Sequence, residues 1–231
     1  MYFRTAHRYT ARAMSDVSTP FPLQKPTAIV FDIGDTLLEV TGFDAAAGMK
    51  ALARHADPAT PLDVAHAVRL SRELDRQFEP ICADTGIEYS QRAFQKLVFD
   101  QLGVQFTVDA AEIERIYWEG AARFEVEPGI HEALDAVHAH GVRMAVISNA
   151  VFSAPVLAAE LERRGLLRYF EFVISSADYG VRKPHPAIFR VCLTRMGLPA
   201  EECWYAGNYA HIDVEGAHGV GMRPLWYNRA A

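Results

Sequence analysis

The chain has 231 residues, of which 50% are hydrophobic and 23% are charged, and its formal net charge is -6. This is enough apolar sequence to bury a sizeable core in one large or two small domains. The negative charge offers no basic surface for nucleic acid or an anionic membrane, and no apolar run approaches the ~18 residues of a membrane span. We therefore expect neither nucleic acid nor a membrane as a partner.

Residues 1–25 are predicted to form a weakly ordered tail. The opening, MYFRTAHRYTARAM, has several arginines but no apolar core, so it is unlike a secretory signal. The three cysteines, Cys82, Cys192 and Cys203, are odd in number and widely spaced, which favours neither a disulfide framework nor a zinc site. These features predict a protein of the reducing cytoplasm.

Five short apolar segments predict buried β-strands. They are AIVF (28–31), MAVI (144–147), FEFVI (170–174), CWYA (203–206) and MRPLW (222–226). Most lack polar alternation, as strands covered on both faces do. One helical pattern, 130–137, precedes the second strand. Three more follow the second, third and fourth strands: a stretch after Asn149, then 184–197, then 211–219. Strands that alternate with helices predict a Rossmann-like α/β fold, with a parallel five-stranded sheet and helices on both faces.

The interval 42–127 breaks this alternation. It contains no convincing strand but several helical patterns, such as the one formed by Phe94, Leu97, Val98 and Leu102. We therefore predict that 42–127 is a helical domain inserted into a core domain made of 26–41 and 128–231.

Polar side chains follow four of the predicted strands. In open α/β sheets, ligands bind beyond the carboxyl ends of the strands, so these side chains are expected to meet at one rim. The residues are Asp32, Gly34, Asp35 and Thr36 after the first strand, Ser148 and Asn149 after the second, Lys183 after the third, and Asn208 and Asp213 after the fourth.

Four segments at these positions resemble, in order and approximate spacing, the motifs of the haloacid dehalogenase (HAD) superfamily of hydrolases. They are FDIGDTLL, VISN, GVRKPHPAIF and GNYAHIDVEGA, and the resemblance covers nearly everything from residue 27 onward. The helical insert lies where the C1 cap of that superfamily lies. The resemblance implies a two-domain hydrolase whose substrate is a small, phosphorylated molecule.

The resemblance also implies roles for single residues. Asp32 corresponds to a nucleophile that forms a covalent intermediate, and Lys183 to the cation that neutralises the charge gathering there. Ser148 and Asn149 correspond to residues that hold a phosphate oxygen. Taken alone, the same residue types also occur as turn aspartates, helix caps and solvated surface lysines.

A Mg²⁺ cofactor is implied as well. Phosphatases of the superfamily bind it through the nucleophile, the backbone carbonyl two residues later and an acidic residue of the fourth motif. Asp32 and Gly34 match this pattern, Asn208 stands where Asp is often found, and Asp213 remains as a direct or water-mediated ligand. Because an amide oxygen brings less charge than a carboxylate, we expect weak metal binding.

Gly34 is the largest departure from the pattern. Superfamily phosphatases usually carry a second Asp there, which protonates the leaving oxygen and then activates water, worth roughly 10²–10⁴ in rate. Asp35 follows in a place commonly held by Gly, as though the two residues had been exchanged. Three roles for Asp35 stay open: replacement acid, turn cap, or partner of the flap that follows. Thr36 is expected to support the turn or the nucleophile through a hydrogen bond.

The leading hypothesis is a Mg²⁺-dependent phosphatase that acts on a small phosphate ester through an aspartyl-phosphate. Gly34 and Asn208 favour an alternative, a catalytically impaired binding or regulatory protein that keeps the fold. A metal-independent 2-haloacid dehalogenase is a further alternative, since that family also lacks the second Asp. A phosphomutase fits least, because returning a phosphoryl group to a sugar relies on the missing acid.

Overall fold

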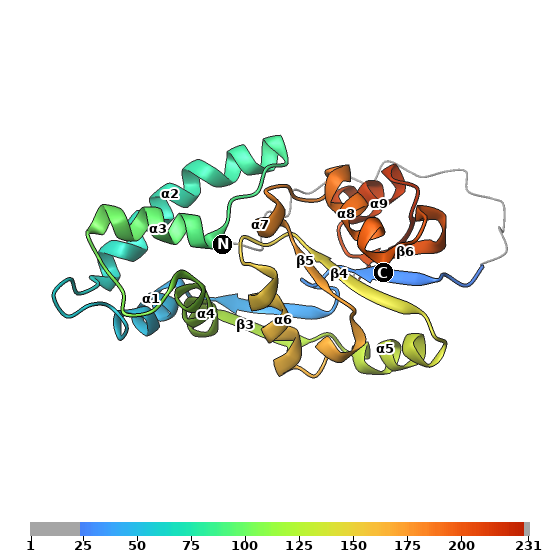
Figure 1. Ribbon diagram of the computed structural model, residues 1–231, viewed down its shortest axis with the longest axis horizontal. Coiled ribbons are helices and arrows are strands. Elements are labelled where there is room, and N and C mark those ends of the chain that lie inside the picture. Colours follow the sequence, from blue (N-terminus) through green and yellow to red (C-terminus); the bar gives the residue numbers. More distant parts are fainter. Residues whose placement is uncertain (1–23, 229–231) are drawn as a thin grey trace.

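The computed structural model describes residues 24–228 (Figure 1). Most of the predicted tail, residues 1–23, lies outside the described residues. The right-hand part of Figure 1 holds the main sheet and its helices, and the left-hand part is a block of helices α1 to α4. Within 24–228, none of the helices combines the length and the apolar character that crossing a membrane requires.

The main sheet has five parallel strands in the order β5-β4-β1-β6-β7. This confirms the predicted Rossmann-like α/β fold, although β5 begins three residues later than expected. The strands are β1 (Ala28–Phe31), β4 (Arg143–Ser148), β5 (Val173–Ser175), β6 (Cys203–Gly207) and β7 (Arg223–Trp226).

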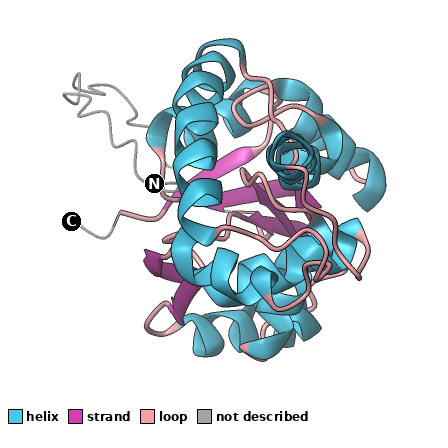
Figure 2. Cartoon of the chain, turned by 90° about the vertical axis from the view of Figure 1, so that its left-hand side faces the viewer, coloured by secondary structure: helices cyan, strands magenta, loops and turns pink. Residues whose placement is uncertain are grey.

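Both faces of the sheet are covered, because successive side chains of a strand point to opposite faces. In β1, Ile29 and Phe31 belong to one buried cluster, whereas Ala28 and Val30 belong to another. Figure 2 shows the strands enclosed between helices. The first cluster includes residues of α5 (Ile130–Ala139) and α6 (Ala154–Arg163), and the second includes residues of α8 (Pro186–Met196) and α9 (Glu215–Gly219).

Two helices begin differently from the prediction. Helix α8 begins at Pro186 rather than at residue 184, because the His185 ring nitrogen accepts a hydrogen bond from Ala187 N and Pro186 takes the first helical position. The segment before α9 is a π-helix, Ala210–Val214. Short helices also occur at Leu167–Tyr169, Ser176–Tyr179 (α7) and Ala200–Glu202.

The insert contains a strand, which corrects the prediction of an all-helical interval over 42–127. Strand β3 (Ala122–Val126) pairs antiparallel with β2 (Leu38–Phe43), and the two run side by side between the main sheet and the helical block (Figure 1). Within β3 only Phe124 is buried, so the strand has no unbroken apolar run, although ARFEV alternates apolar and charged residues. The division into a core and a separate cap domain stays a prediction.

The four helices of the insert start at side-chain caps. Asp44, Asp63, Ser90 and Asp109 each accept a hydrogen bond from a backbone N–H of the first turn, which satisfies a donor without an intrahelical partner. The helices are α1 (Ala45–Ala53), α2 (Val64–Thr85), α3 (Gln91–Leu102) and α4 (Ala110–Ala121).

Candidate active site

The carboxyl ends of β1 and β4 and the loop before α8 meet at a cavity of about 70 Å³. This volume has room for one small anionic group such as phosphate. Thr36, Asn208 and Asp213 are the predicted site residues that do not line it. Its walls are formed by Asp32, Gly34, Asp35, Ser148, Asn149, Lys183, Tyr209 and Ile212.

Lys183 lies at the centre of a buried cluster beside this cavity. Its Nζ donates to Asp32 Oδ1 at 2.8 Å, to Asp213 Oδ1 at 2.7 Å and to the Tyr205 hydroxyl at 2.7 Å. The side chain of Lys183 is 1% exposed, and those of Asp32 and Asp213 are 9% and 1% exposed. All three ammonium protons therefore have acceptors, and one of these acceptors is a carboxylate that lines the cavity.

Burial and the neighbouring charges act in opposite directions on this cluster. Burial raises the pKa of Asp32 to about 6, with Lys183 opposing the shift and Asp213 adding to it. Burial alone would lower the pKa of Lys183, but Asp213 and Asp32 outweigh it and leave that pKa raised. Lys183 is therefore charged at neutral pH, and Asp32 is largely ionised there.

Asn149 holds the backbone of Lys183 from both sides. Its Oδ1 accepts from Lys183 N at 2.7 Å, and its Nδ2 donates to Lys183 O at 2.9 Å. The predicted phosphate-binding residue thus uses its side chain to fix the lysine, while it still lines the cavity together with Ser148. Ser148 is buried and is the last residue of β4.

Asp35 occupies a backbone conformation that favours glycine, with φ at 54°. Its N–H donates to Leu38 O at 2.7 Å, and its Oδ1 accepts from Val40 N at 3.1 Å, so the side chain caps the turn that leads into β2. The Thr36 hydroxyl is buried and has no hydrogen-bond partner within the described chain. The Thr36 backbone N–H donates to Ile33 O at 3.3 Å, so Thr36 supports the turn through its backbone rather than through its hydroxyl.

A family model for "haloacid dehalogenase-like hydrolase" matches residues 26–221. The chain belongs to the haloacid dehalogenase-like hydrolases. A similar protein is the glyceraldehyde 3-phosphate phosphatase of Methanothermobacter thermautotrophicus, which is 30% identical over 203 residues, covering 87% of this chain and 85% of the relative.

Solved structures show the same fold. The 2-haloacid dehalogenase of Pseudomonas syringae pv. Tomato is 25% identical with a TM-score of 0.58, and the match covers 87% of this chain and 85% of the other. A HAD phosphatase from Thermococcus onnurineus is 23% identical with a TM-score of 0.54, covering 90% and 88%. The resemblance seen in the four motifs is thus confirmed.

The oxygen donors of this HAD-like hydrolase fit Mg²⁺, although residues 24–228 hold no group of three His, Cys, Asp or Glu side chains that could bind a metal. The Asn208 Oδ1 is buried and lacks a hydrogen-bond partner within that range, so a ligand reaching it would satisfy an unpaired acceptor. Asp32 and Gly34 line the cavity and Asn208 does not, but all three offer oxygen, the donor type that Mg²⁺ prefers. Both Asp213 oxygens accept hydrogen bonds, from Lys183 Nζ and Tyr209 N, so the structure favours Asp213 as a partner of Lys183.

Two tyrosines of the site were missed by sequence reasoning. Tyr205 is fully buried within β6 and donates its hydroxyl to Ile147 O at 3.2 Å while accepting from Lys183. Tyr209 lines the cavity. The available signal was a tyrosine inside an otherwise apolar buried strand, because a buried phenol needs a hydrogen-bond partner.

Proposed function

We propose that this HAD-like hydrolase is a phosphatase that acts on a small phosphate ester through a phosphorylated Asp32. The observation that carries the proposal is the buried pair of Asp32 and Lys183, 2.8 Å apart, at the wall of a cavity that Ser148 also lines. Positive charge beside a carboxylate nucleophile is what phosphoryl transfer requires, since its catalysis is mostly positioning and charge stabilisation.

In the first step, a carboxylate oxygen of Asp32 attacks phosphorus. A new oxygen–phosphorus bond forms as the bond to the leaving oxygen breaks, and that oxygen departs with the electron pair. Lys183 offsets the negative charge that Asp32 and the phosphoryl group bring together, and Ser148 supplies a hydroxyl for a phosphate oxygen. Water then cleaves the acyl phosphate, which releases inorganic phosphate and restores Asp32.

The leaving oxygen receives little help in this site. Gly34 has no side chain, and the Asp35 carboxylate is hydrogen-bonded to Val40 N. Burial, followed by the Asp35 and Asp32 carboxylates, raises the pKa of the Tyr209 phenol, so Tyr209 holds its proton firmly. We therefore expect esters of acidic alcohols, such as p-nitrophenyl phosphate, to react much faster than alkyl phosphates.

Mg²⁺ is proposed as the cofactor, held by Asp32, the Gly34 carbonyl and Asn208. When bound, it supplies positive charge to the transferring phosphoryl group. The Methanothermobacter relative is a glyceraldehyde 3-phosphate phosphatase, which supports a small phosphorylated metabolite as the substrate class.

The test is hydrolysis of p-nitrophenyl phosphate by purified protein with and without Mg²⁺, beside the Asp32→Asn variant. We expect turnover that depends on Mg²⁺ and disappears in the variant, which also controls for contaminating phosphatases. Activity that survives in Asp32→Asn would contradict the proposal. Phosphate binding without hydrolysis of any activated ester would instead support the binding-protein alternative.

A 2-haloacid dehalogenase is the second candidate, favoured by Gly34 and by the fold match to the Pseudomonas enzyme. Its nucleophile would be the same Asp32, which would attack carbon and expel halide. Among the described residues that line the cavity, however, Lys183 is the only cation and no arginine is present. Metal-independent release of chloride from 2-chloropropionate would show that the protein is a dehalogenase rather than a phosphatase.

A further inference from the structure

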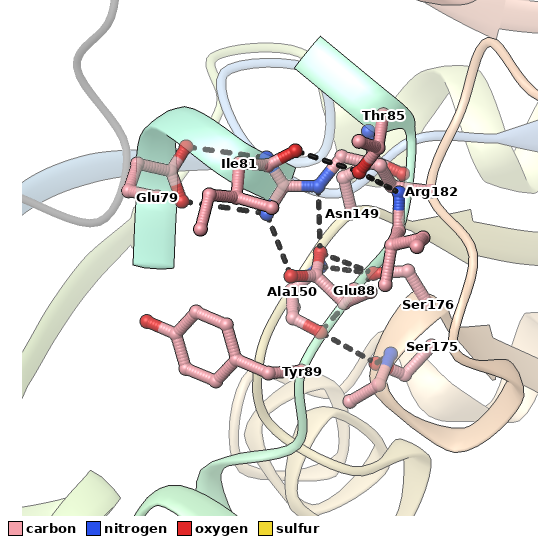
Figure 3. A network of polar contacts seen from close by, with 12 residues as sticks. Glu79, Ile81, Thr85, Glu88, Tyr89, Asn149, Ala150, Ser175, Ser176 and Arg182 are labelled. Carbon is pink, nitrogen blue, oxygen red and sulfur yellow. Dashed lines mark hydrogen bonds and ion pairs between the residues drawn. The ribbon is translucent and has the colours of Figure 1, made fainter. Parts of the chain in front are cut away.

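Glu88 is a buried carboxylate that lies outside the cavity, in the segment that follows helix α2. Its side chain is 1% exposed. Its Oε1 accepts from Arg182 Nη2 at 2.6 Å, and its Oε2 accepts from Arg182 Nε at 3.1 Å and from Ser176 Oγ at 2.9 Å. Figure 3 shows Glu88 between these two partners. The carboxylate therefore connects two loops of the core: it binds the loop between α7 and α8 directly, and it reaches the loop after β4 through Ser176 at the start of α7.

The first of these loops carries Lys183. Arg182 directly precedes Lys183, and its backbone N–H donates to Gly86 O at 2.9 Å, while Glu88 N donates to Gly180 O at 3.0 Å. An antiparallel bridge between residues 87 and 181 lies between these bonds. The segment after α2 thus pairs with the lysine loop through its backbone as well as through the bidentate ion pair.

The second loop carries the residues that end β4. Ser176 Oγ, which donates to Glu88, also accepts from Ala150 N at 2.9 Å. Ala150 directly follows Asn149, whose side chain holds the backbone of Lys183 on both sides. Glu88 is therefore linked to both ends of the Asn149–Lys183 contact, through Arg182 on one side and Ser176 on the other.

A second acidic residue connects this network to the body of α2. Glu79, within α2, accepts from Arg182 Nη1 at 3.1 Å and from Nη2 at 3.4 Å (Figure 3). Its side chain is 38% exposed, compared with 1% for Glu88. Exposed pairs contribute little, whereas breaking a buried pair leaves an uncompensated charge, so Glu88 is the dominant partner of Arg182.

We propose that Glu88 is a positioning residue of the active site, which sets the lysine loop against the Ser148–Asn149 loop and joins both to α2. The inference rests on the proposed function, because the atoms that it places are Lys183 Nζ and the groups that hold phosphate. Misplacing such groups by about 1 Å costs about 10²-fold in rate. Glu88 itself does not line the cavity and exchanges no proton with the substrate.

The direct test is the isosteric Glu88→Gln variant, compared with Arg182→Gln and the double variant. Glutamine replaces one acceptor oxygen by an NH₂ group, which would face the Arg182 or Ser176 donors. We expect kcat/KM for p-nitrophenyl phosphate to fall by about 10- to 100-fold in Glu88→Gln, and phosphate affinity by calorimetry to fall too. Because Glu88 and Arg182 act as one unit, kcat/KM of the double variant should be no lower than that of Arg182→Gln alone.

Glu114→Gln is the matched control. Glu114 is also 1% exposed and binds an arginine (Arg92) and a serine (Ser153) between the insert and the core, but it contacts neither Lys183 nor Arg182. Its replacement should lower the melting temperature and leave kcat/KM and phosphate affinity, per folded molecule, near wild type. This separates a positioning role from a structural one.

The positioning role is overturned if Glu88→Gln lowers only the melting temperature, as Glu114→Gln does. It is also overturned if the losses of kcat/KM in Glu88→Gln and Arg182→Gln add up in the double variant. If the wild type hydrolyses no ester, the proposed function fails, and phosphate affinity still tests the placement of the two loops. If the wild type also binds no phosphate, both inferences fall together.

Discussion

Replacing Lys183 by methionine tests the charge balance of the buried cluster that it forms with Asp32 and Asp213. At neutral pH the cluster carries two carboxylates and one ammonium, all almost fully buried. Removing the ammonium leaves two buried carboxylates without a cation. Such a loss costs about 3–5 kcal/mol of folding free energy, so Lys183→Met should be strongly destabilised at pH 7 as well as inactive.

Asp32→Asn should have the opposite effect on stability, because it leaves a neutral pair of Lys183 and Asp213. The rise of the Asp32 pKa from its ordinary 3.8 to about 6 corresponds to ~3 kcal/mol. Folding favours the protonated form, so this contribution to stability is complete below pH 3.8 and is lost as the pH rises through about 6. The asparagine variant lacks that loss, so the difference between its free energy of unfolding and that of wild type should grow by ~2 kcal/mol between pH 4 and pH 7.

The assay is urea denaturation of the three proteins in EDTA, at several pH values between 4 and 7.5. EDTA removes divalent cations that would otherwise add charge to the site. At pH 7 we expect the free energy of unfolding of Lys183→Met to be lower than that of wild type, and that of Asp32→Asn to be higher. A pH-independent difference between Asp32→Asn and wild type, or an equal loss in both variants, would refute this expectation.

Three further predictions concern residues in and beside the site. Exchanging Gly34 and Asp35, as Gly34→Asp with Asp35→Gly, should raise kcat on alkyl phosphates by about 10²–10⁴ and change aryl phosphate turnover little; equal gains on both ester classes would refute this. Gly207→Ala should lower kcat/KM at least about tenfold by kinetic assay, because its Cβ would lie 2.4 Å from Asp213 Cγ and push the Lys183 partner aside; unchanged kinetics would count against it. Asn208→Asp should tighten Mg²⁺ binding in calorimetry, and weaker binding would argue against this ligand.

Much of the fold could be predicted from short apolar segments, because strands buried on both faces leave unbroken apolar runs such as AIVF at 28–31. Strand β3 was missed because the prediction relied on unbroken apolar runs, although its residues ARFEV alternate apolar and charged types as a half-buried strand does. Its pairing with β2 is a long-range contact that no local pattern encodes. The start of α8 was misplaced because His185 caps the helix, a role that its residue type does not signal.

The site was predicted through the side chains that follow each strand, and the cavity brings Asp32, Ser148 and Lys183 together. What the sequence could not supply was the direction of each side chain. Asn149 is turned toward the backbone of Lys183, and Asp35 toward Val40 N. Such partners depend on how loops pack, and loops from different strands meet only in the folded chain.

The most direct measurement of the central claim is acid quenching of the protein during turnover of an activated phosphate ester, followed by peptide mass spectrometry. The account predicts a phosphoryl group on the peptide that contains Asp32, and none in Asp32→Asn. Steady turnover with no phosphorylated peptide in rapidly quenched samples, or a phosphoryl group on another residue, would contradict it.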